Sequence, residues 1–204
     1  MKRVVIKVGS GVVYGRSGRF AGVRFSKIAE QVASIRNHHV HVVFVMSGAV
    51  ALGTRCHVSK IDDRERRHAA AIGQIVLVSG VRAVFHRCGL TAAQVLVSVN
   101  DDGSVSEAAH VRRTIDTCFV EGTVPVLNGN DPASQLVNND ILAAKVAELI
   151  SADQVLILTT PNGSPYSVGG REAKEQASRM LAGAGIPLKV LDGRIRNAIL
   201  ENVL

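Results

Sequence analysis

Val4-Val5-Ile6-Lys7-Val8-Gly9-Ser10-Gly11 is the stretch that indicates the fold of this chain, together with a second apolar run that ends at Ser47-Gly48-Ala49. Each is a short β-branched run ending in small, flexible residues, as expected where a buried strand delivers a backbone turn to a ligand. Lys7 is the anomaly, because a lysine inside a buried strand is costly unless an anion meets it. The run therefore predicts a phosphate or carboxylate partner at the end of this strand.

The composition is that of one globular domain. The 204 residues are 47% hydrophobic and only 20% charged, with 3% aromatic residues and no Trp, so the core must be built from Val, Ile, Leu and Ala. No apolar run approaches the roughly 20 residues of a transmembrane helix, and strand-like sequence begins too early for a signal peptide. The three cysteines, Cys56, Cys88 and Cys118, lack metal or redox spacing. Free thiols in the cytoplasm, with no membrane association, are the expectation.

Strand-like runs alternate with segments of helical period along the chain. The runs cover residues 3–9, 40–46, 91–98, 123–128, 154–159 and 187–191. Helical segments include residues 25–37 and 106–121, a segment starting at Asn139-Asp140 and running to 150, and a long or broken helix over residues 65–88 that contains Gly73 and Gly80. This order predicts parallel crossovers, and hence an α/β fold: a three-layer α/β/α sandwich around a mainly parallel sheet.

Candidate ligand-binding turns follow four of these runs. They lie at residues 9–11, 47–49, 128–131 and 159–163, and they are rich in Gly, Ser, Thr, Asn and Asp. Because ligands collect at the carboxyl ends of strands in an open parallel sheet, the coincidence of these turns on one edge predicts a polar site there. Any one of them alone is an ordinary turn.

Several function classes are excluded or disfavoured. There is no P-loop, no Gly-x-Gly-x-x-Gly in the first turn, no His-Glu-x-x-His and no Gly-x-Ser-x-Gly. The net charge of +7 is compatible with nucleic acid, with anionic substrates or with solubility alone. Aromatic residues for base stacking are almost absent, which disfavours nucleic-acid binding. The one dense basic cluster, Arg64, Arg66 and Arg67, is interpreted as a solvated helix start after Asp62-Asp63.

In the order of its motifs the chain resembles the amino acid kinase family, and within it the glutamate 5-kinases. The resemblance covers nearly the whole chain. It is carried by residues 5–10 (VIKVGS), 45–50 (VMSGAV), 69–74 (AAAIGQ), 93–96 (AQVL), 124–131 (VPVLNGND), 138–140 (NND) and 168–174 (VGGREAK). It implies a single domain over residues 1–204, with a substrate half at about 1–150 and a shortened nucleotide half at about 151–204.

The resemblance also implies an activity and its residues. Family members transfer the γ-phosphoryl group of ATP, with Mg²⁺, and glutamate 5-kinases transfer it to the side-chain carboxylate of glutamate. The implied catalytic residues are Lys7, Asp140 and Lys174. The implied substrate-binding residues are Ser47, Gly48, Ala49, Asp131 and Asn139. The implied ATP-binding residues are Lys7, Gly9, Ser10, Thr159, Gly169, Gly170 and Lys174, and no protein metal ligand is implied.

Two alternatives stay open. Without the resemblance, Asp140 is also what a helix N-terminus favours, and Lys174 is also an ordinary charge on a solvated helix face. The chain moreover departs from the family after residue 166, where a few dozen residues of the nucleotide half are skipped. The main hypothesis is therefore a compact kinase for glutamate or a related small amino acid. The alternative is a degenerate homologue that binds a ligand or a partner subunit without phosphoryl transfer.

Self-association is a further expectation. The Ala- and Val-rich segment over residues 69–84 is hard to cover in a domain of this length. It is either a buried central helix or a surface that packs on the same helix of another copy, and the second interpretation predicts a homo-oligomer, a dimer or a tetramer.

Overall fold

A six-stranded, entirely parallel sheet forms the centre of the molecule. The computed structural model describes residues 1–15, 19–54, 61–136, 138–161 and 170–204. The strands are β1 (Arg3–Val8), β2 (His41–Met46), β3 (Ala92–Val97), β4 (Val124–Gly129), β5 (Gln154–Thr159) and β6 (Leu188–Asp192). Their order in the sheet is β3-β4-β2-β1-β5-β6. All six strands were predicted, with ends that differ by at most one residue.

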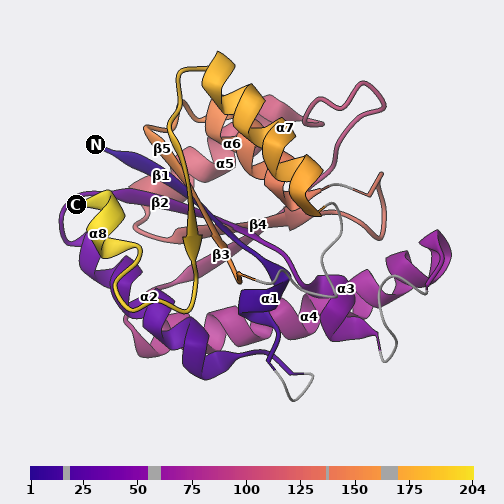
Figure 1. Cartoon of the computed structure of the whole chain (residues 1–204), viewed down its shortest axis with the longest axis horizontal. Coiled ribbons are helices and arrows are strands. Elements are labelled where there is room, and N and C mark those ends of the chain that lie inside the picture. Colours follow the sequence, from indigo (N-terminus) through magenta and orange to yellow (C-terminus); the bar gives the residue numbers. More distant parts are fainter. Residues whose placement is uncertain (16–18, 55–60, 137, 162–169) are drawn as a thin grey trace.

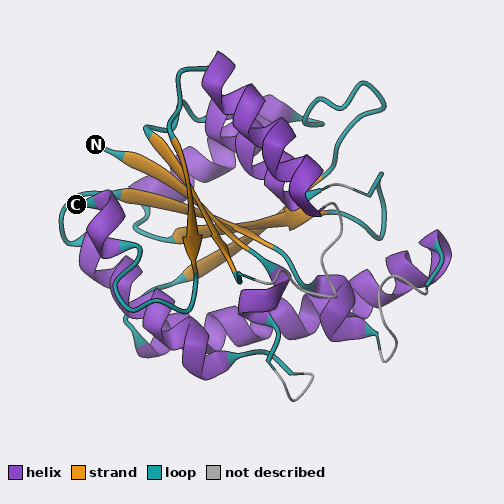
Figure 2. Cartoon of the chain, viewed as in Figure 1, coloured by secondary structure: helices purple, strands orange, loops and turns teal. Residues whose placement is uncertain are grey.

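Helices cover both faces of this sheet, as the predicted three-layer sandwich requires (Figures 1 and 2). One face carries α2 (Gly22–Arg36) and α4 (Asp63–Arg87), and the other carries α5 (Ala108–Val120), α6 (Asn139–Leu149) and α7 (Gly170–Gly183). The short helices are α1 (Ser10–Val13), α3 (Ala49–Gly53) and α8 (Leu200–Val203). The segment over residues 65–88 was predicted as either a long or a broken helix, and the structure has one continuous helix there.

The alternation of side chains along β1 explains where Lys7 points. Val4, Ile6 and Val8 pack into the core beneath α2 and α4, whereas Val5 packs into the core beneath α5, α6 and α7. Since successive side chains of a strand point to opposite faces, Lys7 lies on the face of Val5. It is therefore directed towards α6 and α7.

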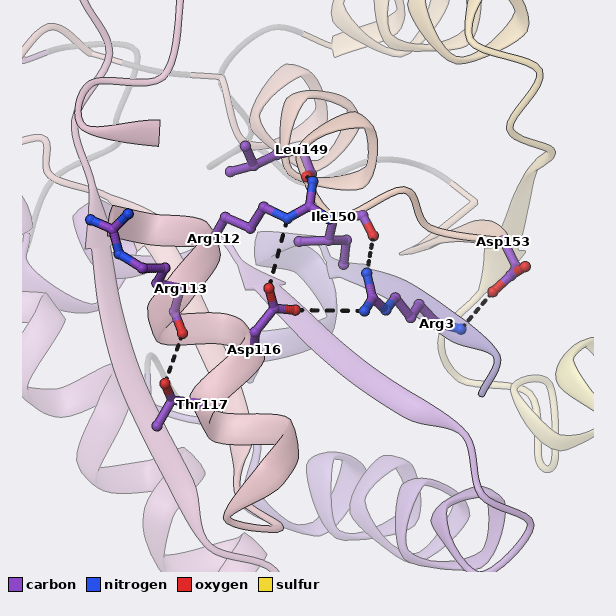
Figure 3. A network of polar contacts seen from close by, with 8 residues as sticks. All are labelled: Arg3, Arg112, Arg113, Asp116, Thr117, Leu149, Ile150 and Asp153. Carbon is purple, nitrogen blue, oxygen red and sulfur yellow. Dashed lines mark hydrogen bonds and ion pairs between the residues drawn. The ribbon is translucent and has the colours of Figure 1, made fainter. Parts of the chain in front are cut away.

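A polar network around Arg3 joins the elements at the start of β1, the end away from Lys7 (Figure 3). The Arg3 guanidinium donates to the carbonyl of Ile150, at 2.6 Å, and lies 3.6 Å from Asp116. Arg112 donates to the carbonyl of Leu149 at 2.9 Å. These cations meet carbonyls that the end of α6 leaves without a helical partner. The network thereby fixes α6 against β1 and α5.

Helices α3 and α4 approach each other unusually closely. A Cβ placed on Gly73 would lie 1.8 Å from the carbonyl oxygen of Ala49, and one on Gly53 would lie 1.9 Å from that of Ala69. Only glycine allows such backbone contact. By length and composition alone α4 could also cross a membrane, but its residues Leu77 and Val81 are buried in the core. One side of α4 therefore packs against the core.

Candidate functional site

Two lysines from different elements converge on one buried carboxylate at the carboxyl ends of the strands. Lys7 Nζ lies 2.6 Å from one carboxylate oxygen of Asp140, and Lys174 Nζ lies 2.9 Å from the other. Lys7 comes from β1, Asp140 from the first turn of α6, and Lys174 from α7. The sequence-predicted catalytic residues are thus brought together, although 34 positions separate Asp140 from Lys174.

Burial and charge act against each other in this cluster. The side chains of Lys7 and Asp140 are 8% and 3% exposed, and that of Lys174 is 27% exposed. Burial lowers the pKa of Lys7, and the carboxylate of Asp140 partly offsets this. Burial alone would raise the pKa of Asp140, but the charges and hydrogen bonds of Lys7 and Lys174 outweigh it and lower that pKa. Asp140 is therefore a carboxylate at neutral pH, held between two ammonium groups.

The local sequence explains the position of Asp140. Asn138 is the N-cap of α6, and its side-chain oxygen accepts a hydrogen bond from the Asp140 amide at 2.8 Å. The helix begins at Asn139, so Asp140 is a first-turn residue that the helix dipole also favours as an anion. Of the two helix-terminal positions that suit Asp140, the cap and the first turn, it occupies the first turn, and Asn138 is the cap.

A cavity of about 330 Å³ adjoins the lysine pair. Its wall includes the turn after β2, the ends of β1 and β4, and the starts of α4, α6 and α7. Of the predicted site residues, Lys7, Ser10, Ser47, Gly48, Ala49, Asp131, Asn139, Asp140 and Lys174 line it. A cavity of this size suits a small ligand, and its wall contains both polar and apolar groups.

Backbone geometry shapes the turn after β2. The Ser47 amide donates to the carbonyl of Val8 at 2.9 Å, which continues the pairing of β1 with β2 into the turn. Gly48 has φ of 109°, a conformation that favours glycine, and a Cβ there would lie 3.3 Å from Val13. Helix α3 then starts at Ala49. The turn can therefore come close to a ligand without a side chain in the way.

The predicted nucleotide-binding residues differ in position. The Gly9 amide was expected to donate a hydrogen bond to a phosphate oxygen. It donates instead to the carbonyl of Leu158, at 2.8 Å, and thereby joins β1 to β5. Thr159 lies beside Gly9 but does not line the cavity. Gly170 begins α7, and its carbonyl accepts a long hydrogen bond from Lys174 at 3.4 Å. Gly169 lies outside the described residues.

Two arginines of the basic cluster belong to the site, contrary to the interpretation of that cluster as solvated. Arg66 lines the cavity. Arg67 donates to the carbonyls of Asp131 and Ser134 and so anchors the loop after β4. Only Arg64 is fully exposed. Arg66 and Arg67 lie on the side of α4 that faces the strand ends. The sequence alone does not show which side of α4 that is, because it depends on how the helix packs on the sheet.

Asn128 lies in the predicted ligand-binding turn over residues 128–131, although the resemblance did not imply a role for it. It is buried at the end of β4, lines the cavity and donates to the side-chain oxygen of Gln74 at 2.6 Å. Gln74 follows Gly73 on α4, so this bond ties the helix to the sheet at the site. An Asn directly after a buried apolar run was the available signal.

The donor set suits phosphate better than a metal held by protein. The described residues contain no group of three or more His, Cys, Asp or Glu side chains able to hold a metal ion. Asp140 is occupied by the two lysines. Mg²⁺ is commonly bound through phosphate oxygens and water with only one or two carboxylates. The residues present therefore fit an ion that arrives with a nucleotide.

Comparison with solved structures gives the same fold. UMP kinase from Ureaplasma parvum superposes with a TM-score of 0.72 at 15% identity, covering 99% of this chain and 94% of that one. Isopentenyl phosphate kinase superposes with a TM-score of 0.67 at 16% identity, covering 98% and 95%. At such low identity the likeness shows the fold alone, which is that of the amino acid kinases.

Sequence comparison identifies the family. Glutamate 5-kinase of Anaeromyxobacter dehalogenans (strain 2CP-C) is 32% identical over 241 positions, covering 98% of this chain and 63% of the relative. Glutamate 5-kinase of Cereibacter sphaeroides is 34% identical over 178 positions, covering 84% and 48%. The chain thus spans less than two thirds of the length of these relatives. The Amino acid kinase family model matches residues 2–176, and the chain belongs to that family.

Proposed function

We propose that this chain transfers the γ-phosphoryl group of ATP to the side-chain carboxylate of glutamate or a related small amino acid, giving an acyl phosphate. The observation that carries the proposal is the Lys7–Asp140–Lys174 cluster in the wall of the cavity. Relatives named glutamate 5-kinase at about 30% identity support the substrate class.

The two lysines would supply the countercharge that phosphoryl transfer needs. Negative charge is spread over the phosphoryl oxygens in the transition state, and catalysis consists of positioning and neutralisation. Lys7 and Lys174 each carry several N–H donors, and Asp140 fixes the position of both. Bound ATP, with Mg²⁺, would supply the phosphoryl group. A substrate carboxylate is already ionised at neutral pH, so no general base is required.

The amino acid would occupy the part of the cavity made by the substrate half, residues 1–150. Ser47, Gly48 and Ala49 would bring backbone and hydroxyl donors to it, and Asp131 and Asn139 would contact its polar groups. Lys174 belongs to the proposed nucleotide half, residues 151–204. The lysine pair thus lies at the junction of the two halves, where acceptor and donor would meet.

ATP-dependent hydroxamate formation tests the proposal. Hydroxylamine traps an acyl phosphate, so wild-type protein with glutamate and ATP should give a signal. Lys7→Met should lower it by at least about a hundredfold, as expected for loss of one preorganised charge contact. Lys189→Met on β6 is the matched control, because Lys189 is exposed and lies outside the cavity. Folded protein without turnover on any small acid contradicts the proposal.

A non-catalytic ligand-binding homologue is the second candidate. The alignment with the Anaeromyxobacter relative runs over 241 positions, more than the 204 residues of this chain, so this chain lacks residues that the relative has. Only ten residues separate the end of β5 from the start of α7. Calorimetry with Mg-ATP distinguishes the two candidates. If the protein binds Mg-ATP and both Lys7→Met and Lys174→Met weaken that binding, the kinase is favoured. If the folded protein binds an amino acid but no nucleotide, the second candidate is favoured.

We also propose that the chain acts in the cytoplasm as a homo-oligomer. Cys88 and Cys118 are free thiols in the structure, which suits a reducing compartment. Helix α4 exposes Ile72, Ile75 and Val76, which a second copy would cover.

A further inference from the structure

Two residues that line the same cavity, Arg66 and Asn139, each carry a polar atom without a hydrogen-bond partner in the described part of the chain, one a donor and one an acceptor. Arg66 Nε and Asn139 Oδ1 are both buried, and neither has a hydrogen-bond partner among the described residues. Arg66 comes from α4 and Asn139 from α6, so they reach the cavity from helices on opposite faces of the sheet. Buried polar atoms are nearly always hydrogen-bonded, and leaving one unpaired costs free energy. The pair therefore indicates a ligand with one acceptor and one donor group.

The neighbouring arginines show that the position of Arg66 is specific. Arg67 donates from one guanidinium nitrogen to the backbone carbonyls of Asp131 and Ser134. Arg64 is exposed to solvent. Arg66 alone of the three lines the cavity, and no ion pair to it occurs in the part of the chain that the structure describes. By contrast, Lys7 and Lys174, the other cations of the cavity wall, already share Asp140.

We propose that Arg66 binds the α-carboxylate of the amino-acid substrate. This rests on the proposed function, in which the side-chain carboxylate lies at Lys7. A guanidinium suits a carboxylate because its planar fork donates two parallel hydrogen bonds. Asn139 Oδ1 would accept a hydrogen bond from the neighbouring ammonium group. A substrate that places one carboxylate at Lys7 and another at Arg66 must carry two carboxylates. The site therefore selects dicarboxylic amino acids over ω-amino acids, which have a single carboxylate.

Calorimetric binding of glutamate to the full chain tests Arg66 without requiring turnover. Arg66→Gln should weaken glutamate binding at least about tenfold, in line with the loss of a charged hydrogen bond. The same variant should leave the weak affinity for 4-aminobutyrate, which lacks the α-carboxylate, within about twofold of wild type. Arg64→Gln, which removes the same charge from an exposed position of the same helix, should bind both ligands as wild type does.

Activity provides the second readout and separates the two proposals. If wild type forms hydroxamate, Arg66→Gln should raise KM for glutamate at least about tenfold with little change in kcat, because the contact is present before and during transfer. An active wild type whose KM is unchanged by Arg66→Gln overturns the role of Arg66 and leaves the kinase intact. An inactive wild type that binds glutamate through Arg66 overturns the kinase and supports Arg66. Equal binding by wild type and Arg66→Gln, or no binding by either, overturns the role of Arg66.

Discussion

Asp140 is the residue on which the charge balance of the site depends. It is almost completely buried, and it neutralises Lys7, which is nearly as buried. Removing one partner of a buried ion pair leaves the other charge without compensation, which costs far more than breaking a surface pair. The same carboxylate orients Lys174, so its loss would affect both the stability of the fold and the geometry of the proposed phosphoryl site.

Substituting Asp140→Asn should lower the free energy of unfolding at pH 7 by about 3–5 kcal/mol. The folded-state pKa of Asp140 is lowered by the two lysines, so its contribution to stability is fully present above the unfolded value near 3.9. It is lost as the pH falls through the lower folded value. Urea unfolding at a series of pH values should therefore show the gap between wild type and variant narrowing below about pH 4.

The matched control is Asp192→Asn. Asp192 also accepts hydrogen bonds from a cation, Arg194, but at the surface. Its loss should cost no more than about 1 kcal/mol. Equal losses for the two variants, or a gap that widens in acid, would contradict the role given to Asp140.

At the scale of elements, the contact between α3 and α4 shapes the substrate end of the cavity. Ala49 begins α3 and lines the cavity, and its carbonyl rests against Gly73 of α4. Gly73→Ala would place a methyl group 1.8 Å from that oxygen, so the helices must separate. We expect a loss of about 1–3 kcal/mol in stability, as for other overpacked sites, together with a higher KM for the amino acid.

Thermal unfolding and substrate titration of Gly73→Ala check this prediction. Gly183→Ala is the control, because Gly183 ends α7 with no atom within 4 Å of an added Cβ. That substitution should be neutral or slightly stabilising. A Gly73→Ala protein as stable as Gly183→Ala would show that α3 and α4 can move apart at no cost.

Gly73 also illustrates how far the sequence predicts the elements. The strands were predictable because their β-branched runs are short and bounded by turn residues. A glycine within a helical segment, however, has two meanings: it can break the helix, or it can allow another backbone to approach. The choice depends on α3, a five-residue helix with too little periodicity to predict. Gly73 serves the second purpose, so the helix over Asp63–Arg87 is continuous.

The same limit applies to the site. Lys7 was predictable because a lysine in an apolar run requires an anion, and the structure provides Asp140. Arg66 was not, since a basic cluster after two aspartates fits a solvated helix start equally well. What distinguishes Arg66 from Arg64 is which side of α4 faces the strand ends, and that depends on how the whole helix packs.

At the scale of the whole molecule, the strand order accounts for the position of the site. From β1 the chain passes through α2 to β2, the neighbour of β1 in one direction along the sheet. From β5 it passes through α7 to β6, the neighbour of β5 in the opposite direction. The connecting helices lie on opposite faces, so a crevice forms where β1 and β5 adjoin. Lys7 is the next-to-last residue of β1, and the Gly9 amide donates to the Leu158 carbonyl of β5. A site at this position follows from the topology.

The outer side of α4 should form the contact between two copies of the chain. Ile72, Ile75 and Val76 are 45%, 68% and 43% exposed, and their spacing places them on one side of the helix. Apolar residues gathered on one helix face favour burial against a matching surface, and a two-fold axis brings the same helix of a second copy to it. Light scattering should therefore give the mass of at least two 21.6-kDa chains at micromolar concentration.

Ile75→Glu tests whether this face is the contact. A charge at the most exposed of the three positions should raise the dissociation constant of the oligomer at least about tenfold, as expected when a central apolar contact is lost. Val120→Glu is the control, because Val120 is 84% exposed at the end of α5 on the other face of the sheet. It should leave the mass unchanged. A monomeric wild type would remove the need for a partner, and an oligomer that Ile75→Glu does not weaken would place the contact elsewhere.

The oligomer should also affect the site, because Arg66 of the same helix lines the cavity. An intact oligomer should hold the substrate end of the site in place. Ile75→Glu should therefore raise KM for the amino acid, although it changes none of the hydrogen-bonding groups that contact the substrate.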